Sequence, residues 1–278
     1  MAIYDIHDGD LTELERRMCA WAEEAGDLAL TWFRRTGDLE FKAGREVVTE
    51  ADRRIEQLLR ERIATAYPDD LIVGEEYGGE PADASAGRSS GHPRRVWQVD
   101  PIDGTLNFAL GLPEFCLSLA VLQGDTVLSG GVFQPISGDA FTASRGNGAR
   151  RNGRPMRVSD RPCLADAVIS PHLKTASPIL ADAALLQQLT VRPYKVRKMG
   201  AVALELAYVA AGWYDGLVAS FGTTICLWDV AAGLLLVTEA GGRVSDLCGR
   251  PYVHGGPDLL AANPAVHGDL VTLLGAGD

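Results

Sequence analysis

Apolar residues recur at steps of three and four along the first part of the chain, which predicts an amphipathic helix from Leu11 to about Arg35. Thr12 is the expected N-cap of this helix, and Glu15 three residues later would complete a capping box. The same periodicity predicts a second helix, which begins after Thr49 and ends near Ala66. Thr49 is the natural N-cap of that second helix.

Short apolar runs bounded by glycine, proline and acidic residues predict strands. The run at 71–73 has the pattern of a buried strand and ends in carboxylates. The runs at 115–122 and 126–133 are separated by a Gly-Asp turn, which is typical of a β-hairpin, and 139–143 would add a third strand. Residues 78–93 are polar and rich in structure breakers, so we expect a flexible loop there.

The second half of the chain alternates between strand and helix patterns. The expected elements are a strand at 167–170, a helix around 179–189, a strand near 196, a helix at 201–211, a strand at 215–219, a helix at 228–240, strands at 243–245 and 259–262, and a final helix to 274. The arginine- and glycine-rich segment from Arg145 to Arg157 is expected to be a solvated basic loop rather than a phosphate site. This order of elements indicates an α/β or α+β fold of layered sheets and helices.

One apolar run ends in an unusual way. The predicted strand at 97–99 is followed by Asp100 and Asp103, with a proline between them, and then by the turn residues Gly104 and Thr105. Two carboxylates at the mouth of a buried strand repel each other and lose hydration unless a cation lies between them. Backbone N–H groups at a turn that opens a helix form a ready anion site. We interpret the segment as a divalent-metal site beside a phosphate cradle.

Two further acids have a similar context, because Glu75 lies at a strand end and Asp229 lies in the first turn of a helix. The backbone carbonyl of Ile102 would point the same way as its two acidic neighbours. Magnesium prefers oxygen ligands and retains several waters, so a few convergent carboxylates suffice. Metal ions beside an amide cradle are typical of phosphoryl-transfer chemistry. The sequence allows two interpretations of Asp52: it is either an acid favoured by the helix dipole or a functional residue.

Composition narrows the class of protein. The 278 residues suffice for one large domain or two modest ones, and we treat 1–278 as a single domain with approximate halves at 1–160 and 161–278. The five cysteines are scattered, which indicates reduced thiols in a cytoplasmic protein. A net charge of −11 argues against a basic face for nucleic acid. No apolar stretch approaches the about 18 residues of a membrane span, so no membrane partner is expected.

Six segments together carry a family resemblance that none of them carries alone. They are Val48–Asp52, Gly74–Glu76, Asp100–Phe108, Phe141–Ala149, Arg197–Leu206 and Trp228–Gly233. In this order they resemble the inositol monophosphatase family over about residues 30 to 270. The resemblance implies a layered αβαβα sandwich of the sugar-phosphatase type, usually dimeric. It also implies a magnesium-dependent, typically lithium-sensitive phosphatase of small phosphorylated metabolites that uses two to three Mg²⁺ ions.

The resemblance also assigns roles to individual positions. The implied metal ligands are Glu75, Asp100, Asp103 and Asp229 through their side chains and Ile102 through its carbonyl. The implied catalytic set is Thr105, Asp52, Glu75 and Asp100, in which Thr105 and Asp52 orient and activate the nucleophilic water. The implied substrate-binding residues are Asp103, Gly104, Thr105, Gly200, Ala201 and Asp229. Lys42 resembles a basic residue near a third metal, whereas Glu76 is not expected to be a primary ligand.

The sequence departs from the family at the substrate pocket. Members that bind inositol phosphate carry a glutamate seven residues before the late metal-binding aspartate, where this chain has Gly222, or Ala219 if the segment is aligned from Asp215. Histidinol phosphate, fructose 1,6-bisphosphate and 3′-phosphoadenosine 5′-phosphate are therefore alternative substrates, although the segment 106–108 is closer to the inositol branch. A non-enzymatic binding or regulatory protein that retains the fold is the alternative of another class.

Overall fold

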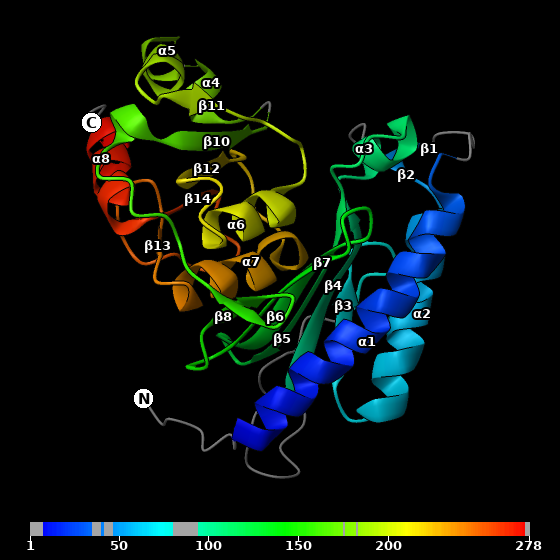
Figure 1. Ribbon diagram of the computed structural model, residues 1–278. Coiled ribbons are helices and arrows are strands. Elements are labelled where there is room, and N and C mark those ends of the chain that lie inside the picture. The colour runs from blue at the N-terminus through cyan, green and yellow to red at the C-terminus, as the bar shows by residue number, and fades with distance from the viewer. Residues whose placement is uncertain are drawn as a thin grey trace.

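Two sheets of unequal width organise the chain (Figure 1). The computed structural model describes residues 8–34, 40–41, 47–79, 94–174, 176–181 and 183–275. The wider sheet has seven strands in sequence order: β3 (Leu71–Gly74), β4 (Arg95–Asp103), β5 (Cys116–Gln123), β6 (Thr126–Gln134), β7 (Asp139–Ser144), β8 (Ala149–Arg151) and β9 (Arg154–Met156). Only β3 and β4 pair in parallel, so the rest of this sheet is an antiparallel meander.

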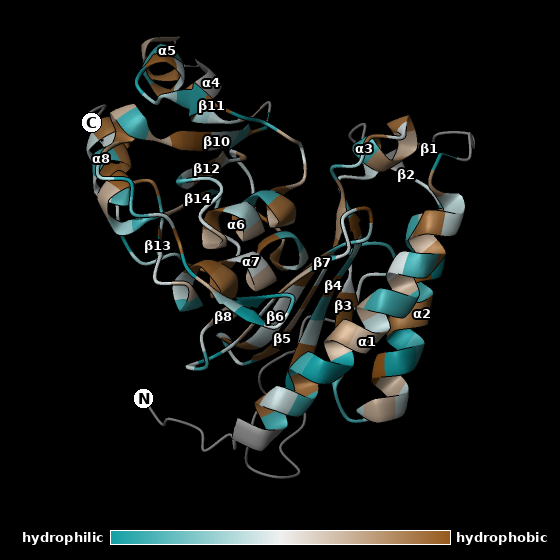
Figure 2. Cartoon of the chain, viewed as in Figure 1, coloured by the Kyte–Doolittle hydropathy of each residue, from teal (hydrophilic) through white to brown (hydrophobic). Residues whose placement is uncertain are grey.

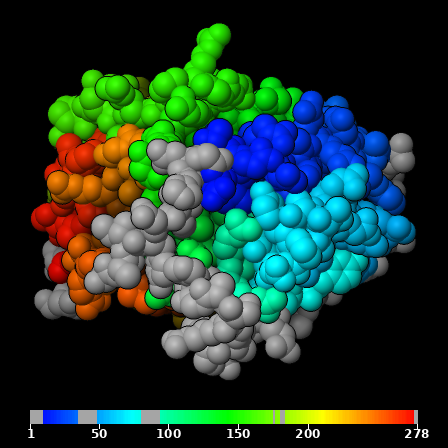
Figure 3. Space-filling model, turned by 90° about the horizontal axis from the view of Figure 1, so that it is seen from below, coloured from blue at the N-terminus to red at the C-terminus, as the bar shows by residue number. Residues whose placement is uncertain are grey.

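Two helices cover the outer face of this sheet, α1 (Asp8–Trp32) and α2 (Glu50–Ala66). Their apolar stripes pack with β4, β5 and β6 in one core, where Met18, Ile55 and Trp97 are fully buried. The opposite, polar faces form the surface on which α1 and α2 lie side by side in Figure 3. Both predicted helices are confirmed.

The predicted capping box of the first helix was wrong. Helix α1 begins at Asp8, so Thr12 lies inside it. The Glu15 carboxylate instead accepts hydrogen bonds from the hydroxyl groups of Thr142 at 2.5 Å and Ser144 at 3.2 Å on β7. The acid therefore joins the helix to the sheet, a long-range role that a local cap pattern cannot reveal.

The narrower sheet has the strand order β11-β10-β12-β14-β13, and helices lie on both of its faces. Its strands are β10 (Val168–Leu173), β11 (Lys195–Val196), β12 (Gly216–Ser220), β13 (Arg243–Ser245) and β14 (Asp258–Ala262). Between the two sheets lie α6 (Val202–Ala210) and α7 (Leu227–Glu239), which are mostly apolar (Figure 2) and largely buried. A helix that is apolar on nearly all sides is typically buried between layers of the core.

The remaining helices complete the outer layer on the far side of the narrower sheet. They are the 3₁₀ turn η1 (Leu164–Asp166), α4 (Pro178–Ala181), α5 (Ala183–Val191) and α8 (Pro264–Gly275). A short pair, β1 (Glu40–Phe41) and β2 (Val47–Val48), and the six-residue helix α3 (Thr105–Leu110) lie beside the wider sheet. The layers are thus helix, sheet, helix, sheet and helix, which confirms the predicted αβαβα sandwich.

Two segments, 145–157 and 179–189, differ from the structure that the sequence predicts for them. The segment from Arg145 to Arg157 is not one loop, because it contains the hairpin of β8 and β9 at the edge of the wider sheet. Asn152 and Gly153 form its two-residue turn with φ of 50° and 74°, the left-handed pair that an Asn-Gly turn favours. The helix expected around 179–189 is two helices, α4 and α5, and residue 182 between them lies outside the described residues.

Candidate metal centre and catalytic site

A bulge at the end of β4 directs two carboxylates to the same side of the sheet. Asp100 pairs with Ser118 and Asp103 with Cys116 on β5, so β4 has one residue more than its partner between these pairs. Side chains alternate along a strand, and residues three apart would otherwise face opposite ways. With the bulge, Ile102 joins the core under α1 and α2, while Asp100 and Asp103 face the opposite layer. Both aspartates are buried.

Five carboxylates interact electrostatically at this point, and we call them the acid cluster. Burial raises the pKa of Asp100 well above its usual range, and the charges of Glu75, Asp103, Asp229 and Asp52 raise it further. Burial likewise raises the pKa of Asp103, with the charge of Asp229 as the next cause. Within the described part of the chain, no basic side chain forms an ion pair with Asp100 or Asp103. Buried acids without a basic partner fit a site for cations.

The backbone positions of Glu75 and Asp229 support the same arrangement. Glu75 follows β3 directly, and its N–H donates to the carbonyl of Val99, the residue before Asp100, at 3.2 Å. Asp229 lies in the first turn of α7, and the hydroxyl of Ser118 on β5 donates to the Trp228 carbonyl at 2.9 Å. The ends of β3, β4 and α7 therefore meet beside Asp100.

Asp103 has a second function as a cap of a buried helix. Its carboxylate accepts N–H groups from Val202 at 3.2 Å, Ala203 at 2.7 Å and Leu204 at 3.4 Å, at the beginning of α6. These donors and the helix dipole stabilise the negative charge of the aspartate. The Cys116 thiol also donates to Oδ2 at 3.6 Å, whereas Oδ1 accepts only the Val202 N–H within the described part of the chain, so Oδ1 is the oxygen that keeps a lone pair for a metal ion.

Thr105 connects the acid cluster to α2. Its Oγ1 lies 3.2 Å from Asp52 Oδ1 and 2.9 Å from the carbonyl oxygen of Ile102, so this carbonyl is directed to the same place as the hydroxyl. The other oxygen of Asp52 accepts the backbone N–H of Thr49 at 2.9 Å. One oxygen of Asp52 thus caps α2 and the other faces Thr105, so the capping contact leaves the functional interpretation open.

The environment of Asp52 predicts a particular dependence of stability on pH. Burial raises its pKa from 3.8 to about 7, so the folded chain retains a proton that the unfolded chain loses near pH 4. The free energy of unfolding should therefore fall as pH rises from about 4 to about 7, by up to about 4 kcal/mol for this group. In thermal unfolding with EDTA, Asp52→Asn should show a smaller fall in Tm between pH 5 and pH 7.5 than the wild type. Parallel curves for the two proteins would contradict the assignment.

The turn at Gly104 requires glycine. Its φ is +92°, and a Cβ there would lie 2.8 Å from the Glu114 carbonyl oxygen and 3.1 Å from the Cβ of Ala201. Thr105 then begins α3, and the first N–H groups of a helix have no acceptor within it. The predicted substrate residues Gly104, Thr105 and Ala201 thus lie together.

Gly200 and Ala201 lie in the loop that leads into α6, and two residues that the sequence did not single out hold this loop. The side-chain amide of Asn107 on α3 donates to the Met199 carbonyl at 2.7 Å. The fully buried carboxylate of Glu205 accepts the N–H groups of Met199 at 2.5 Å and Gly200 at 3.2 Å. Both residues fall within the segments that carried the family resemblance, which was their only signal in the sequence.

No three His, Cys, Asp or Glu side chains among the described residues form a ready-made cage around one point. Mg²⁺ takes one or two carboxylates per ion and retains several waters, so such a cage is not required. The all-oxygen donors and the buried, mutually repelling charges fit Mg²⁺. Lys42 lies outside the described residues.

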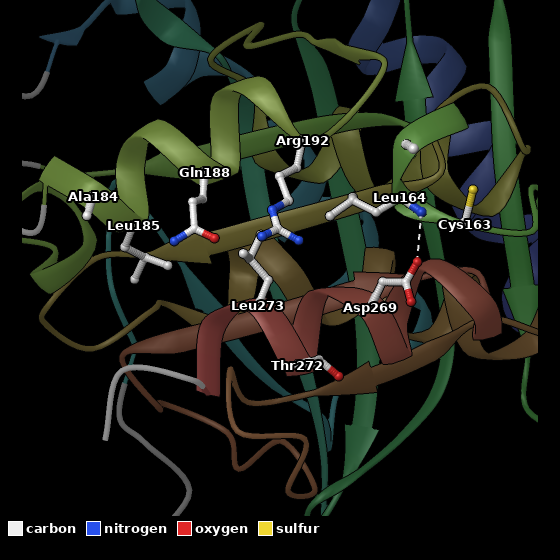
Figure 4. A pocket seen from close by; sticks show the side chains of 10 residues that line it. Cys163, Leu164, Ala184, Leu185, Gln188, Arg192, Asp269, Thr272 and Leu273 are labelled. Atoms are coloured by element: carbon white, nitrogen blue, oxygen red, sulfur yellow. Dashed lines mark hydrogen bonds between the residues drawn. The ribbon is translucent and has the colours of Figure 1, made fainter.

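A cavity of about 590 Å³ lies elsewhere, between η1, α5 and α8 (Figure 4). Leu164, Leu185 and Leu273 give it an apolar lining, and Arg192 and Asp269 border it. None of the predicted site residues lines this cavity. Size alone therefore does not locate the chemistry of this chain, whereas the buried carboxylates do.

The layered fold and the oxygen donors of the acid cluster define a metal-dependent phosphatase of the sugar-phosphatase type. The sequence profile described as "Inositol monophosphatase family" matches residues 10–276. The chain belongs to the inositol monophosphatase family, which confirms the resemblance seen in the sequence, and it is a phosphoric monoester hydrolase. Members of this family depend on a metal ion, in general Mg²⁺, and act on small phosphorylated substrates.

Similar proteins cover nearly the whole chain. A "Fructose-1,6-bisphosphatase/inositol-1-monophosphatase" of Thermotoga maritima is 33% identical over 252 residues, 90% of this chain and 91% of that protein. A "Nus factor SuhB" of Pseudomonas aeruginosa is 37% identical over 264 residues, 91% and 92% of the two chains. The crystal structure of the extragenic suppressor protein suhB of Bartonella henselae has a TM-score of 0.85 and 31% identity, and covers 96% of this chain and 100% of its own. No described helix is long and apolar enough to cross a membrane.

Proposed function

We propose that this chain hydrolyses a small phosphomonoester, similar to inositol 1-phosphate, to an alcohol and inorganic phosphate, with water as the nucleophile and no covalent intermediate. The observation that carries the proposal is the acid cluster with Thr105 beside its member Asp52. Glu75, Asp100, Asp103 and Asp229 would hold two to three Mg²⁺ ions, together with the carbonyl of Ile102. Bound Mg²⁺ would lower the pKa of water and neutralise charge on the phosphate.

Thr105 and Asp52 would orient the attacking water and receive its proton. The 3.2 Å contact allows Thr105 Oγ1 to pass its proton to Asp52 Oδ1 as it accepts one from water. A carboxylate whose burial raises its pKa to about 7 can serve as a base near neutral pH. The N–H groups of Gly104 and Thr105 would hold the phosphate oxygens, and Gly200 with Ala201 would border the alcohol.

The substrate pocket supports a broad choice among polyol phosphates. A glutamate at position 222, as in the inositol-binding members, would not fit this structure. The φ of Gly222 is +66°, and a Cβ there would lie 1.9 Å from the Ala176 carbonyl oxygen. Ala219 is fully buried, and His172 lies opposite it in the sheet. An enzyme rejects a wrong polyol when that polyol leaves a buried polar group of the pocket without a hydrogen bond. This chain lacks the glutamate that would discriminate in this way.

A substrate panel tests this choice. We expect Mg²⁺-dependent phosphate release from inositol 1-phosphate, with kcat/KM for other polyol phosphates within about tenfold of it, because a lost acid removes discrimination. The panel should include histidinol phosphate, fructose 1,6-bisphosphate and 3′-phosphoadenosine 5′-phosphate as the alternative substrates. A preference of roughly 10³-fold or more for inositol 1-phosphate would contradict the broad pocket. A comparable preference for one alternative would reassign the substrate.

A regulatory function is the second candidate, since some relatives bear the name Nus factor SuhB. The complete acid cluster, with Thr105 beside Asp52, favours hydrolysis, because a protein without catalytic function has no need of this costly set of buried charges. Failure to release phosphate from any ester of the panel with Mg²⁺ would favour the regulatory candidate.

We also propose a homodimer in the cytoplasm, with residues 1–278 as one domain. The single-domain proposal is supported by a core that joins both halves, since Phe141 and Leu204 belong to the same buried cluster. The five cysteines are free, as expected in a reducing compartment. Light scattering of the purified chain would test the dimer.

A further inference from the structure

Helix α2 presents three polar residues at intervals of four, which places them on one face of the helix. They are Asp52, Glu56 and Arg60. Asp52 and Glu56 are fully buried, and the Arg60 side chain is 24% exposed. Burial of an acid is costly unless its oxygens are paired, so Glu56 must have a structural or functional reason to lie there.

The Glu56 carboxylate binds the turn that contains Glu75. Its Oε2 accepts the N–H of Glu76 at 2.6 Å, and its Oε1 accepts the N–H of Tyr77 at 3.2 Å. The contact is close enough to require glycine at the end of β3, since a Cβ on Gly74 would lie 2.2 Å from Oε1. Two backbone donors and one charged acceptor thus fix the segment after Glu75.

Arg60 holds the other side of the same turn. Its Nε donates to Glu56 Oε1 at 2.7 Å, and its guanidinium also donates to the carbonyl oxygens of Gly78 and Ile72. The turn is closed by the N–H of Gly74, which donates to the Gly78 carbonyl at 3.0 Å. Glu56 thus accepts hydrogen bonds from N–H groups of the turn, and Arg60 donates to carbonyl oxygens of the turn and of β3. Together the two side chains pair both kinds of backbone group.

We propose that Glu56, supported by Arg60, is a positioning residue that fixes Glu75 for metal binding, an inference that rests on the proposed function. Glu75 is attached on one side to β4, where its N–H reaches Val99, and on the other side to α2 through Glu56. The same face of α2 carries Asp52, which contacts Thr105. One helix therefore sets the position of a metal ligand relative to the pair that activates water.

Mn²⁺ binding tests this inference without relying on turnover. We expect Glu56→Gln to weaken the Kd for Mn²⁺, measured by isothermal titration calorimetry without substrate, by about 10- to 100-fold, the usual effect of a residue that orients a ligand. Gln has one acceptor oxygen, so one backbone N–H of the turn loses its partner. The Mg²⁺ concentration for half-maximal hydrolysis should rise by a similar factor, with kcat at saturating Mg²⁺ within about threefold of wild type.

Two variants make the result specific. Glu61→Gln removes the same charge from an exposed site on the same helix and should leave the Kd unchanged. Arg60→Lys should weaken the Kd in the same direction by a smaller factor, because lysine lacks the fork that reaches the carboxylate and two carbonyls. If Glu56→Gln does not fold, Arg60→Lys decides the question, and an unchanged Kd in a folded Arg60→Lys would overturn the inference.

The outcomes separate this inference from the proposed function. Wild-type protein that binds no Mn²⁺ and releases no phosphate would overturn both. Wild-type protein that binds and hydrolyses normally, beside a Glu56→Gln variant with an unchanged Kd, would overturn only the positioning role. A purely structural role would lower Tm in EDTA and leave the rise in Tm on adding Mn²⁺ intact, whereas the positioning role predicts a smaller rise.

Discussion

Asp100→Asn is expected to lower phosphate release by roughly 10³-fold or more, which corresponds to about 4 kcal/mol of transition-state stabilisation. Asparagine keeps the size of the side chain, so packing at the end of β4 is preserved. The amide has no negative charge with which to hold a divalent cation or to offset the charges that develop in phosphoryl transfer. Steady-state kinetics with saturating Mg²⁺ measure the effect, and Asp229→Asn should behave in the same way.

A second readout separates loss of chemistry from loss of fold. Because burial and neighbouring acids raise the pKa of Asp100, its charge destabilises the folded chain at neutral pH. The asparagine variant should therefore unfold in EDTA at a Tm equal to or above that of the wild type. A variant that keeps full activity would contradict the assignment, and one that loses activity only because it unfolds would show a lowered Tm.

Thr105→Ala is expected to reduce kcat by about 10²- to 10³-fold, the range for removal of a positioned proton-transfer group. The hydroxyl lies 3.2 Å from Asp52 Oδ1 and 2.9 Å from the Ile102 carbonyl, and alanine makes neither contact. The carboxylates of the acid cluster are unchanged in this variant. Its Mg²⁺ dependence should therefore stay close to that of the wild type.

Thr105→Ser is the matched control, since serine keeps the hydroxyl and loses only a methyl group. It should retain kcat within about tenfold of wild type, because the proton path from water to Asp52 is intact. If Thr105→Ala also hydrolyses the substrate within a few-fold of the wild-type rate, Thr105 has no part in activating the water. The other four acids of the cluster would then perform the reaction, with Asp52 in a capping role alone.

Elements with a local signal could be predicted from the sequence. The hairpin of β5 and β6 has two apolar runs and a Gly-Asp turn between them, so the sequence predicts its strands closely. The hairpin of β8 and β9 has an Asn-Gly turn at 152–153, and the arginine-rich composition around it masked that signal. Glu15 fits a cap pattern, yet its hydrogen bonds reach Thr142, and no local pattern contains that contact.

Some residues of the candidate site also have a local signal in the sequence, and others do not. The acids stand out in the sequence because Asp100 and Glu75 end strands and Asp103 follows in the turn, where charge is unusual, and the family resemblance implies their ligand roles. Their shared face depends on the bulge in β4, which the pattern of β4 alone does not show. Glu56 was missed because it lies in the buried stripe of α2 and contacts a turn 20 residues later. Its one signal was an acid four residues after Asp52.

Metal-dependent hydrolysis by wild-type and Asp100→Asn protein is the most direct test of the central claim. Phosphate release from inositol 1-phosphate would be measured across Mg²⁺ concentrations, with EDTA as the zero point. The account predicts release that rises with Mg²⁺ in the wild type, stops in EDTA and returns when Mg²⁺ is restored, with none of this in a folded Asp100→Asn variant. Release that persists in EDTA, or that is equal in the two proteins, would contradict it.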